Sequence, residues 1–156
     1  MDLKQLYQDI ILEHGKSPRN LGKCKGYNHD AKGYNPLCGD KIHVYLKLDK
    51  EKKVENLSFE GEGCAISLAS ASIMTELLRG KSFEETKEIM SAFLNMIKNT
   101  SEIQSNHLNE DQKTKLMSLS GVKQFPMRVK CATLSWHTLV SAMDKKKEDV
   151  NTEVVS

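Results

Sequence analysis

Three of the four cysteines in this sequence lie where one structural element is expected to give way to another. Cys38 stands in the stretch NPLCGD, just before an alternating strand pattern, and Cys64 lies where a strand is expected to become a helix. Cys131 falls in the first turns of the last predicted helix. The free N–H groups and the dipole of a helix N-terminus stabilise a thiolate, which favours ionisation of Cys64 and Cys131.

A carboxylate completes a possible metal-ligand set. Asp40 follows Cys38 by two residues, and positions i and i+2 of an extended chain face the same side. Gly39 between them lets the backbone bend toward a shared centre. Three thiolates and one carboxylate suit zinc, which prefers tetrahedral sulfur, nitrogen and oxygen donors.

The spacing of these residues is not that of a zinc finger, because no C-x-x-C pair occurs. The alternative is that the three cysteines are buried as small hydrophobic residues. Their positions at glycine-flanked junctions and the neighbouring aspartate favour the metal.

The remaining thiol and the histidines show no such setting. Cys24 lies in the polar loop GKCKG without acidic or histidine neighbours, which predicts a bystander thiol. The histidines share no common spacing and are expected at the surface; they are His14, His29, His43, His107 and His137.

Composition indicates one ordinary globular domain in 156 residues, with 38% hydrophobic and 28% charged residues. The net charge of +2 is scattered, so the sequence predicts no nucleic-acid partner. No apolar run approaches the ~20 residues of a bilayer crossing, and the N-terminus lacks a signal-peptide pattern. We therefore expect a cytoplasmic protein without membrane contact, whose thiols are reduced.

The elements that must position these residues can be read from periodicity. A helix is predicted from Leu3, closed by Gly15 and Pro18, and residues 16–37 are expected to form a loop with a weak strand. Period-two alternation predicts strands over 42–48 and 54–59, joined by the turn DKEKK. A helix then follows the stretch GEGC and ends at Gly80.

The C-terminal half is predicted to be helical, with one interruption. A capping box at Ser82 opens a helix to about Lys98, and a polar insertion over 99–110 precedes a short helix over 111–119. A last helix runs to Met143, which closes a single domain over residues 1–143. Residues 144–156 are polar and aperiodic, so we expect a disordered tail whose removal leaves metal binding intact.

Four segments together resemble the NifU/IscU-like family of iron-sulfur assembly proteins. They are LYQDIILEHGKSPRN, NPLCGD, GEGCAISLASASIMTELLRGK and RVKCATLSW, which occur in the family's order over nearly the whole chain. The resemblance implies an α+β, SufE/NifU-like fold: a small antiparallel sheet of about three strands, covered by helices on one side. The third strand would fall within residues 26–37. The family's ligand positions correspond to Cys38, Asp40, Cys64 and Cys131.

Three features distinguish the branches of this family. Scaffold-type members carry a histidine immediately before the third cysteine, where this chain has Lys130, and they carry a Leu-Pro-Pro-Val-Lys motif where this chain reads KQFPMRVK. The SufU branch carries an insertion before the last helix, which residues 99–120 resemble. All three features favour the SufU branch, which resembles a zinc-dependent sulfurtransferase rather than a cluster scaffold.

That branch implies a function for the site. Cys38 would accept persulfide sulfur from a SufS-like, pyridoxal-phosphate-dependent cysteine desulfurase, with a histidine of the desulfurase replacing the cysteine on zinc. The sulfur would pass to a downstream SufBCD-type cluster scaffold. Arg128 resembles a family arginine that could assist the released thiolate, and the alternative for Arg128 is a surface charge at a helix start.

Three classes of function remain open at the level of sequence. The protein is a zinc-dependent sulfurtransferase, an iron-sulfur scaffold that binds a transient cluster, or a binding module in which zinc is purely structural.

Overall fold

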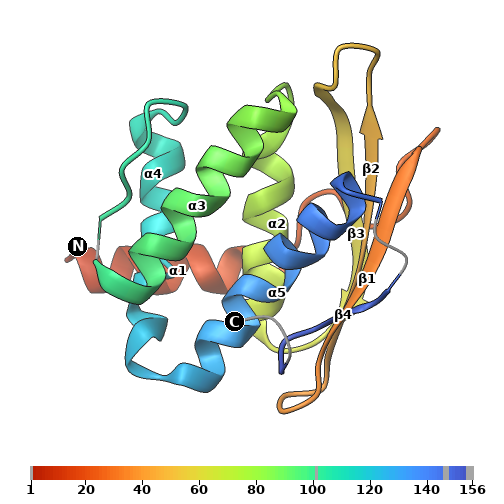
Figure 1. The fold of residues 1–156 in the computed structure, drawn as a ribbon. Coiled ribbons are helices and arrows are strands. Elements are labelled where there is room, and N and C mark those ends of the chain that lie inside the picture. The colour runs from red at the N-terminus through yellow and green to blue at the C-terminus, as the bar shows by residue number, and fades with distance from the viewer. Residues whose placement is uncertain (1, 101, 146–147, 154–156) are drawn as a thin grey trace.

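The computed structural model describes residues 2–100, 102–145 and 148–153. Its helices are α1 (Leu3–Lys16), α2 (Ala65–Leu78), α3 (Phe83–Asn99), α4 (Glu110–Met117) and α5 (Pro126–Met143), with a short 3-10 helix η1 (Ser120–Gln124). Its strands are β1 (His29–Asn35), β2 (Asp40–Leu48), β3 (Val54–Glu62) and β4 (Val150–Asn151). The helices lie on one side of the sheet (Figure 1).

The sheet has the order β3-β2-β1-β4. The three long strands are antiparallel, and β4 is parallel to β1. The predicted α+β architecture is therefore confirmed, and β1 is the third antiparallel strand expected within residues 26–37. The pairing of β1 with β2 starts at Asn35 opposite Asp40, so the turn between these residues holds Cys38 at the end of a hairpin.

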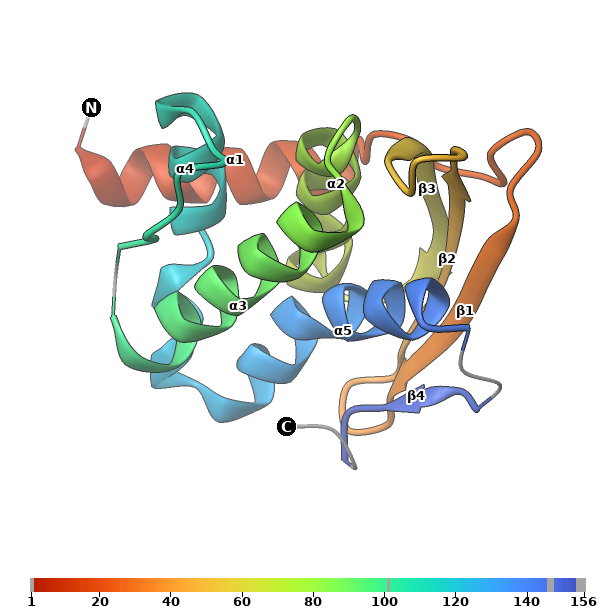
Figure 2. The ribbon, with the colours of Figure 1, turned by 45° about the horizontal axis from the view of Figure 1, so that its top comes forward.

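The core lies between the sheet and the helices. Val44 and Leu46 of β2 are fully buried, as the period-two pattern predicted. Helix α5 lies between the sheet and α3 (Figure 2), and its Trp136 stacks on Phe93 of α3 with ring centroids 4.6 Å apart. Trp136 also donates its indole N–H to the hydroxyl of Ser70 on α2 at 3.1 Å. Packing on both sides therefore fixes the position of α5, which carries Cys131.

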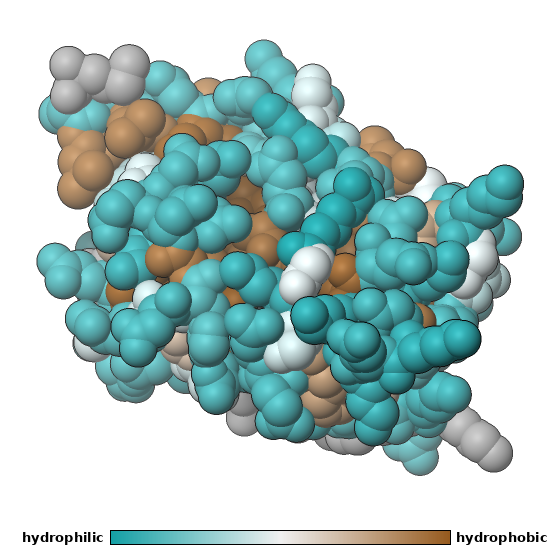
Figure 3. All heavy atoms as spheres, turned by 90° about the horizontal axis from the view of Figure 1, so that it is seen from above, coloured by the Kyte–Doolittle hydropathy of each residue, from teal (hydrophilic) through white to brown (hydrophobic). Residues whose placement is uncertain are grey.

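Helix α1 buries little of its apolar surface. Leu3 and Leu12 remain 61% and 52% exposed, and Ile10 and Ile11 are only partly buried against the core. Gly15 brings the end of α1 close to α2, because a Cβ there would lie 3.2 Å from the Cβ of Ala65. The face drawn in Figure 3 is mainly hydrophilic, and its apolar atoms gather in separate areas.

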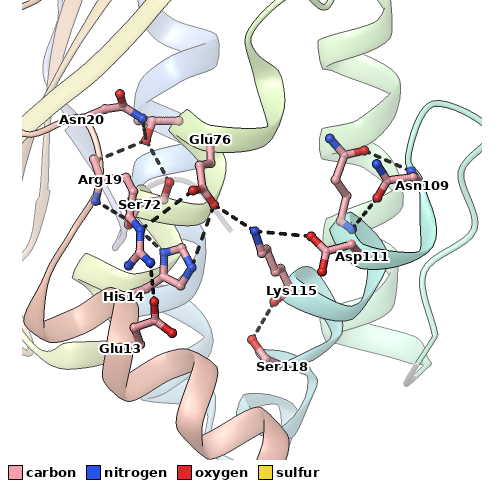
Figure 4. Close-up of polar contacts among 12 residues, drawn as sticks. Glu13, His14, Arg19, Asn20, Ser72, Glu76, Asn109, Asp111, Lys115 and Ser118 are labelled. Atoms are coloured by element: carbon pink, nitrogen blue, oxygen red, sulfur yellow. Dashed lines mark hydrogen bonds and ion pairs between the residues drawn. The ribbon is translucent and has the colours of Figure 1, made fainter.

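A buried polar cluster attaches α1 to α2, and it corrects the expectation that His14 lies at the surface. His14 is 2% exposed, and its Nδ1 lies 2.7 Å from the hydroxyl of Ser72, which also accepts the backbone N–H of Arg19 (Figure 4). Burial lowers the pKa of His14 and keeps the imidazole neutral. Lys115 of α4 donates to Glu76 beside this cluster at 3.1 Å. Hydrogen bonds therefore contribute to the attachment of α1 to α2, to which the exposed leucines of α1 contribute little.

The C-terminal segment also corrects an expectation. Residues 146–147 and 154–156 of the predicted disordered tail lie outside the described residues, but β4 pairs with β1 and Thr152 is 2% exposed. The prediction of a disordered tail is therefore wrong for residues 150–153. A strand of two residues has no periodicity to read, and it forms because β1 offers an unpaired edge.

In the described part of the chain, no helix combines the length and the hydropathy that a bilayer crossing needs.

The polar cluster generates a stability prediction. Replacing Ser72 by alanine should lower the free energy of unfolding by about 1–3 kcal/mol, because it leaves buried partners on His14 and Arg19 without their hydroxyl. Urea unfolding measures this change. Ser91→Ala is the matched control, since Ser91 is exposed on α3 and its replacement should change stability little. Equal losses in the two variants would show that the cluster does not hold α1.

Candidate metal centre

The turn between β1 and β2 presents Cys38. The backbone carbonyl of Asn35 accepts the N–H groups of Cys38 and Gly39 at 3.3 and 2.8 Å. Gly39 has a φ of +75°, a left-handed conformation that glycine adopts without strain. Cys38 is half-buried at this turn, so its thiol can reach both the interior of the site and solvent.

Asp40 begins β2 and is buried, with 1% of its surface exposed. Burying a carboxylate is costly unless it is hydrogen-bonded, and both oxygens of Asp40 have donors. Oδ1 accepts the backbone N–H of Cys64 at 2.9 Å, and Oδ2 accepts the side-chain amide of Asn35 at 3.0 Å. Gly63 leaves room for this arrangement, because a Cβ at that position would lie 2.4 Å from Oδ1.

Cys131 joins these residues from α5. Its side chain is fully buried, and its sulfur accepts the Asn35 amide at 3.3 Å. The possible ligand atoms of Cys38, Asp40 and Cys131 all lie within 4.8 Å of one another. The fold therefore brings a hairpin turn, a strand start and a helix start together at one point.

Cys64 lies beside this group rather than within it. It is the N-cap of α2, where its sulfur accepts the N–H of Ser67 at 3.4 Å. A hydrogen bond from Cys131 lowers the pKa of Cys64 to about 6, and the same contact raises the pKa of Cys131. The two thiols are therefore neighbours, and Cys64 ionises more readily than Cys131.

Arg128 faces the thiols from the first turn of α5. Its hydrogen bond to Cys131, followed by the charges of Cys64 and Cys131, raises the pKa of Arg128 above its ordinary value. The guanidinium is exposed, so solvent screens this attraction. Arg128 therefore has the thiols as partners and is not simply a surface charge at a helix start.

The other candidates lie apart from this group. All four cysteines are free thiols, and Cys24 is buried with 7% of its surface exposed. Among the described residues, the group of possible metal ligands contains no histidine. Sequence reasoning missed Asn35, although it opens the stretch NPLCGD. The Asn-Pro pair signals a turn, but nothing in the sequence tells that the amide points into the site.

The donor set fits zinc in kind. Two sulfurs and one carboxylate oxygen converge here, with the sulfur of Cys64 beside them, and zinc accepts donors of both kinds. The buried Asp40 is held by two hydrogen bonds that leave it lone pairs for a metal.

Comparisons with known proteins agree with this geometry. The model of the NifU-like N-terminal domain matches residues 6–132. The zinc-dependent sulfurtransferase SufU of Bacillus subtilis is 40% identical over 149 residues, which cover 94% of this chain and 95% of that protein. The chain belongs to the NifU/IscU-like family, in its SufU branch.

Other relatives of this SufU-branch chain carry a different description. The iron-sulfur cluster assembly scaffold protein IscU of Streptococcus pyogenes is 36% identical over 143 residues, which cover 92% of this chain and 86% of that protein. A solved structure described as a scaffold protein for the SUF system, FiSufU of Fervidobacterium islandicum, superposes with a TM-score of 0.76 at 34% identity. It covers 89% of this chain and 97% of its own. Relatives of this chain are described both as a sulfurtransferase and as scaffolds, so the choice between these functions depends on the residues of the site.

The close approach of Gly63 to Asp40 generates a prediction. Gly63→Ala should displace the carboxylate, because the new methyl group would overlap Oδ1, and zinc affinity should fall about tenfold or more. Competition with a colorimetric chelator measures the affinity. Gly121→Ala is the matched control, since no atom lies within 4 Å of a Cβ there. Parent-like zinc binding by Gly63→Ala would contradict a role for Asp40 as ligand.

Proposed function

We propose that this protein is a zinc-dependent sulfurtransferase that accepts persulfide sulfur from a cysteine desulfurase and passes it on for iron-sulfur cluster assembly. Cys38 is the acceptor, and Cys38, Asp40, Cys64 and Cys131 are the metal ligands. The observation that carries the proposal is the placement of Cys38: it is half-buried in a turn, while Asp40 and Cys131 beside it are enclosed. Cys64 is half-buried as well, but it caps α2, whereas Cys38 lies in a turn outside any helix or strand.

The transfer step needs no external oxidant or reductant. The thiolate of Cys38 attacks the terminal sulfur of the desulfurase persulfide, a new S–S bond forms on Cys38, and the S–S bond of the donor breaks. The donor cysteine leaves as a thiolate, so the outer sulfur changes carrier without net oxidation. Zinc, when bound, keeps the thiols deprotonated at neutral pH and undergoes no redox chemistry of its own.

Arg128 stabilises negative charge on the sulfur of Cys38. Its guanidinium is attracted to the thiols of Cys131, Cys64 and Cys38, so it can stabilise a released thiolate or a persulfide on Cys38. This interaction is worth little in solvent and more once a docked partner excludes water.

The surroundings of the site suit a protein partner. Leu37 next to Cys38 is 53% exposed, and Phe125 and Met127 shortly before Cys131 are 60% and 51% exposed. Exposed apolar residues that flank a reactive group are typical of a docking surface. A SufS-like desulfurase is the partner that supplies sulfur here, and a SufBCD-type scaffold is the acceptor in the same cytoplasmic compartment.

The second candidate function is an iron-sulfur scaffold, favoured by the description of the Streptococcus pyogenes relative. Against it stands Lys130, which replaces the histidine that scaffold-type members place before the third cysteine. The Lys130 ammonium lies 2.8 Å from Glu153, and an ammonium offers no lone pair to iron. The third candidate, a purely structural zinc, does not account for an acceptor thiol that is only half-buried.

We predict about one zinc per chain, and metal removal should lower the unfolding temperature markedly. The reason is that the ligands tie the β1–β2 turn to the starts of α2 and α5. Elemental analysis and a thermal melt with and without chelator measure both quantities. A chelator that strips zinc without moving the melt would contradict this structural role, and a protein isolated mainly with an iron-sulfur chromophore would favour the scaffold.

Cys38→Ser should abolish sulfur acceptance and stimulation of the desulfurase, while the fold survives on the remaining ligands. Incubation with a SufS-like desulfurase and cysteine, followed by mass spectrometry, should place an added sulfur on Cys38 of the parent protein.

Cys24→Ser is the matched control for this experiment. Cys24 is buried and lies outside the ligand group, so its replacement should leave sulfur transfer unchanged. Sulfur found on Cys24, or normal stimulation by Cys38→Ser, would refute the assignment of the acceptor.

A further inference from the structure

The end of the described chain returns to the metal centre. Strand β4 runs along the edge of β1, with Val150 opposite Gly33 and Asn151 opposite Tyr34 (Figure 2). The backbone N–H of Thr152 then donates to the carbonyl of Tyr34 at 3.0 Å. These contacts place the side chain of Thr152 at the end of β1, next to Asn35.

Thr152 contacts the oxygen side of the Asn35 amide. Its hydroxyl lies 3.1 Å from Oδ1 of Asn35, and the amide nitrogen of Asn35 donates to Asp40 and Cys131 on the other side. An ionised carboxylate can only accept hydrogen bonds, so the NH₂ group must face Asp40, and Cys131 accepts from the same group. The amide oxygen then faces Thr152, which must donate.

Asn35 in turn reaches three of the four candidate ligands. Its side chain donates to Asp40 and Cys131, and its backbone carbonyl accepts the N–H of Cys38. Asn35 itself is fully buried. A group in this position sets the geometry of the ligands without touching the metal, as outer-shell partners of metal ligands do.

We propose that the C-terminal segment 150–153 is a positioning element of the metal centre, and that Thr152 acts through Asn35 on Asp40 and Cys131. The inference rests on the metal site of the proposed function. Without the Thr152 hydroxyl, the Asn35 amide has no donor on its oxygen side and loses the contact that fixes its orientation. The hydrogen bonds to Asp40 and Cys131 then weaken together.

A second contact of the same segment provides a contrast. Glu153 pairs with Lys130, the residue before Cys131, but their side chains are 40% and 32% exposed. An ion pair at that exposure contributes little. The buried hydroxyl of Thr152, rather than the exposed carboxylate of Glu153, is therefore the group that acts on the site.

The test compares three substitutions in the full-length chain. Thr152→Val removes the donor and keeps the shape, Thr152→Ser keeps the donor, and Glu153→Gln removes the exposed ion pair. Zinc affinity is measured by chelator competition, and ligand geometry by the absorption spectrum of the cobalt(II)-substituted protein. Thr152→Val should lose about tenfold or more in zinc affinity and change the cobalt spectrum. Thr152→Ser and Glu153→Gln should bind zinc as the parent does.

A merely structural role for Thr152 would give a different result. It would lower the stability of the metal-free protein to urea and leave the cobalt spectrum unchanged, which would overturn the proposal. Parent-like zinc affinity in Thr152→Val would overturn it as well, and the proposed function would stand. A parent protein that binds neither zinc nor cobalt would refute the proposed function together with this inference.

Discussion

A buried carboxylate among thiols is the constraint on which the rest of this structure depends. Asp40 is almost completely removed from water, and a charge in that position must be hydrogen-bonded or neutralised. The chain supplies one donor from the backbone of Cys64 and another from the side chain of Asn35. These two donors come from opposite sides, so the start of α2 and the end of β1 must both be in place before Asp40 can be buried.

The same constraint explains the division between held and accessible residues. Cys131 is enclosed on a helix that packs between the sheet and α3, and Asp40 is bonded at both oxygens. Cys38 lies in a four-residue turn whose glycine adopts a left-handed conformation, and it keeps partial exposure. A site built this way can keep its candidate metal ligands ordered while one thiol meets a reagent, as the proposed sulfur transfer requires.

The two thiols carried by helices differ in their electrostatics: Cys64 caps α2 and has a lowered pKa, whereas Cys131 lies in the second turn of α5 and has a raised pKa, contrary to the expectation that both would ionise readily. Cys64 ionises more readily than Cys131, because Cys131 and the first-turn N–H of Ser67 both donate to its sulfur. Arg128 adds a positive charge from the solvent side. In contrast, Lys130 points its ammonium to Glu153 of the C-terminal segment. Lys130 is thus bound to the segment that also reaches Asn35.

The sequence by itself determined the local features of this protein. Periodicity of two and of 3.6 predicted β2, β3 and the helices, since each pattern reports which side of an element is buried. Junction cysteines, Asp40 and the family resemblance predicted which residues could bind a metal. Only the tertiary structure decided that Cys38, Asp40 and Cys131 converge, that His14 is buried against Ser72, and that Thr152 closes on Asn35. The contacts of His14 with Ser72 and of Thr152 with Asn35 join residues 58 and 117 positions apart, and no local pattern records such pairings.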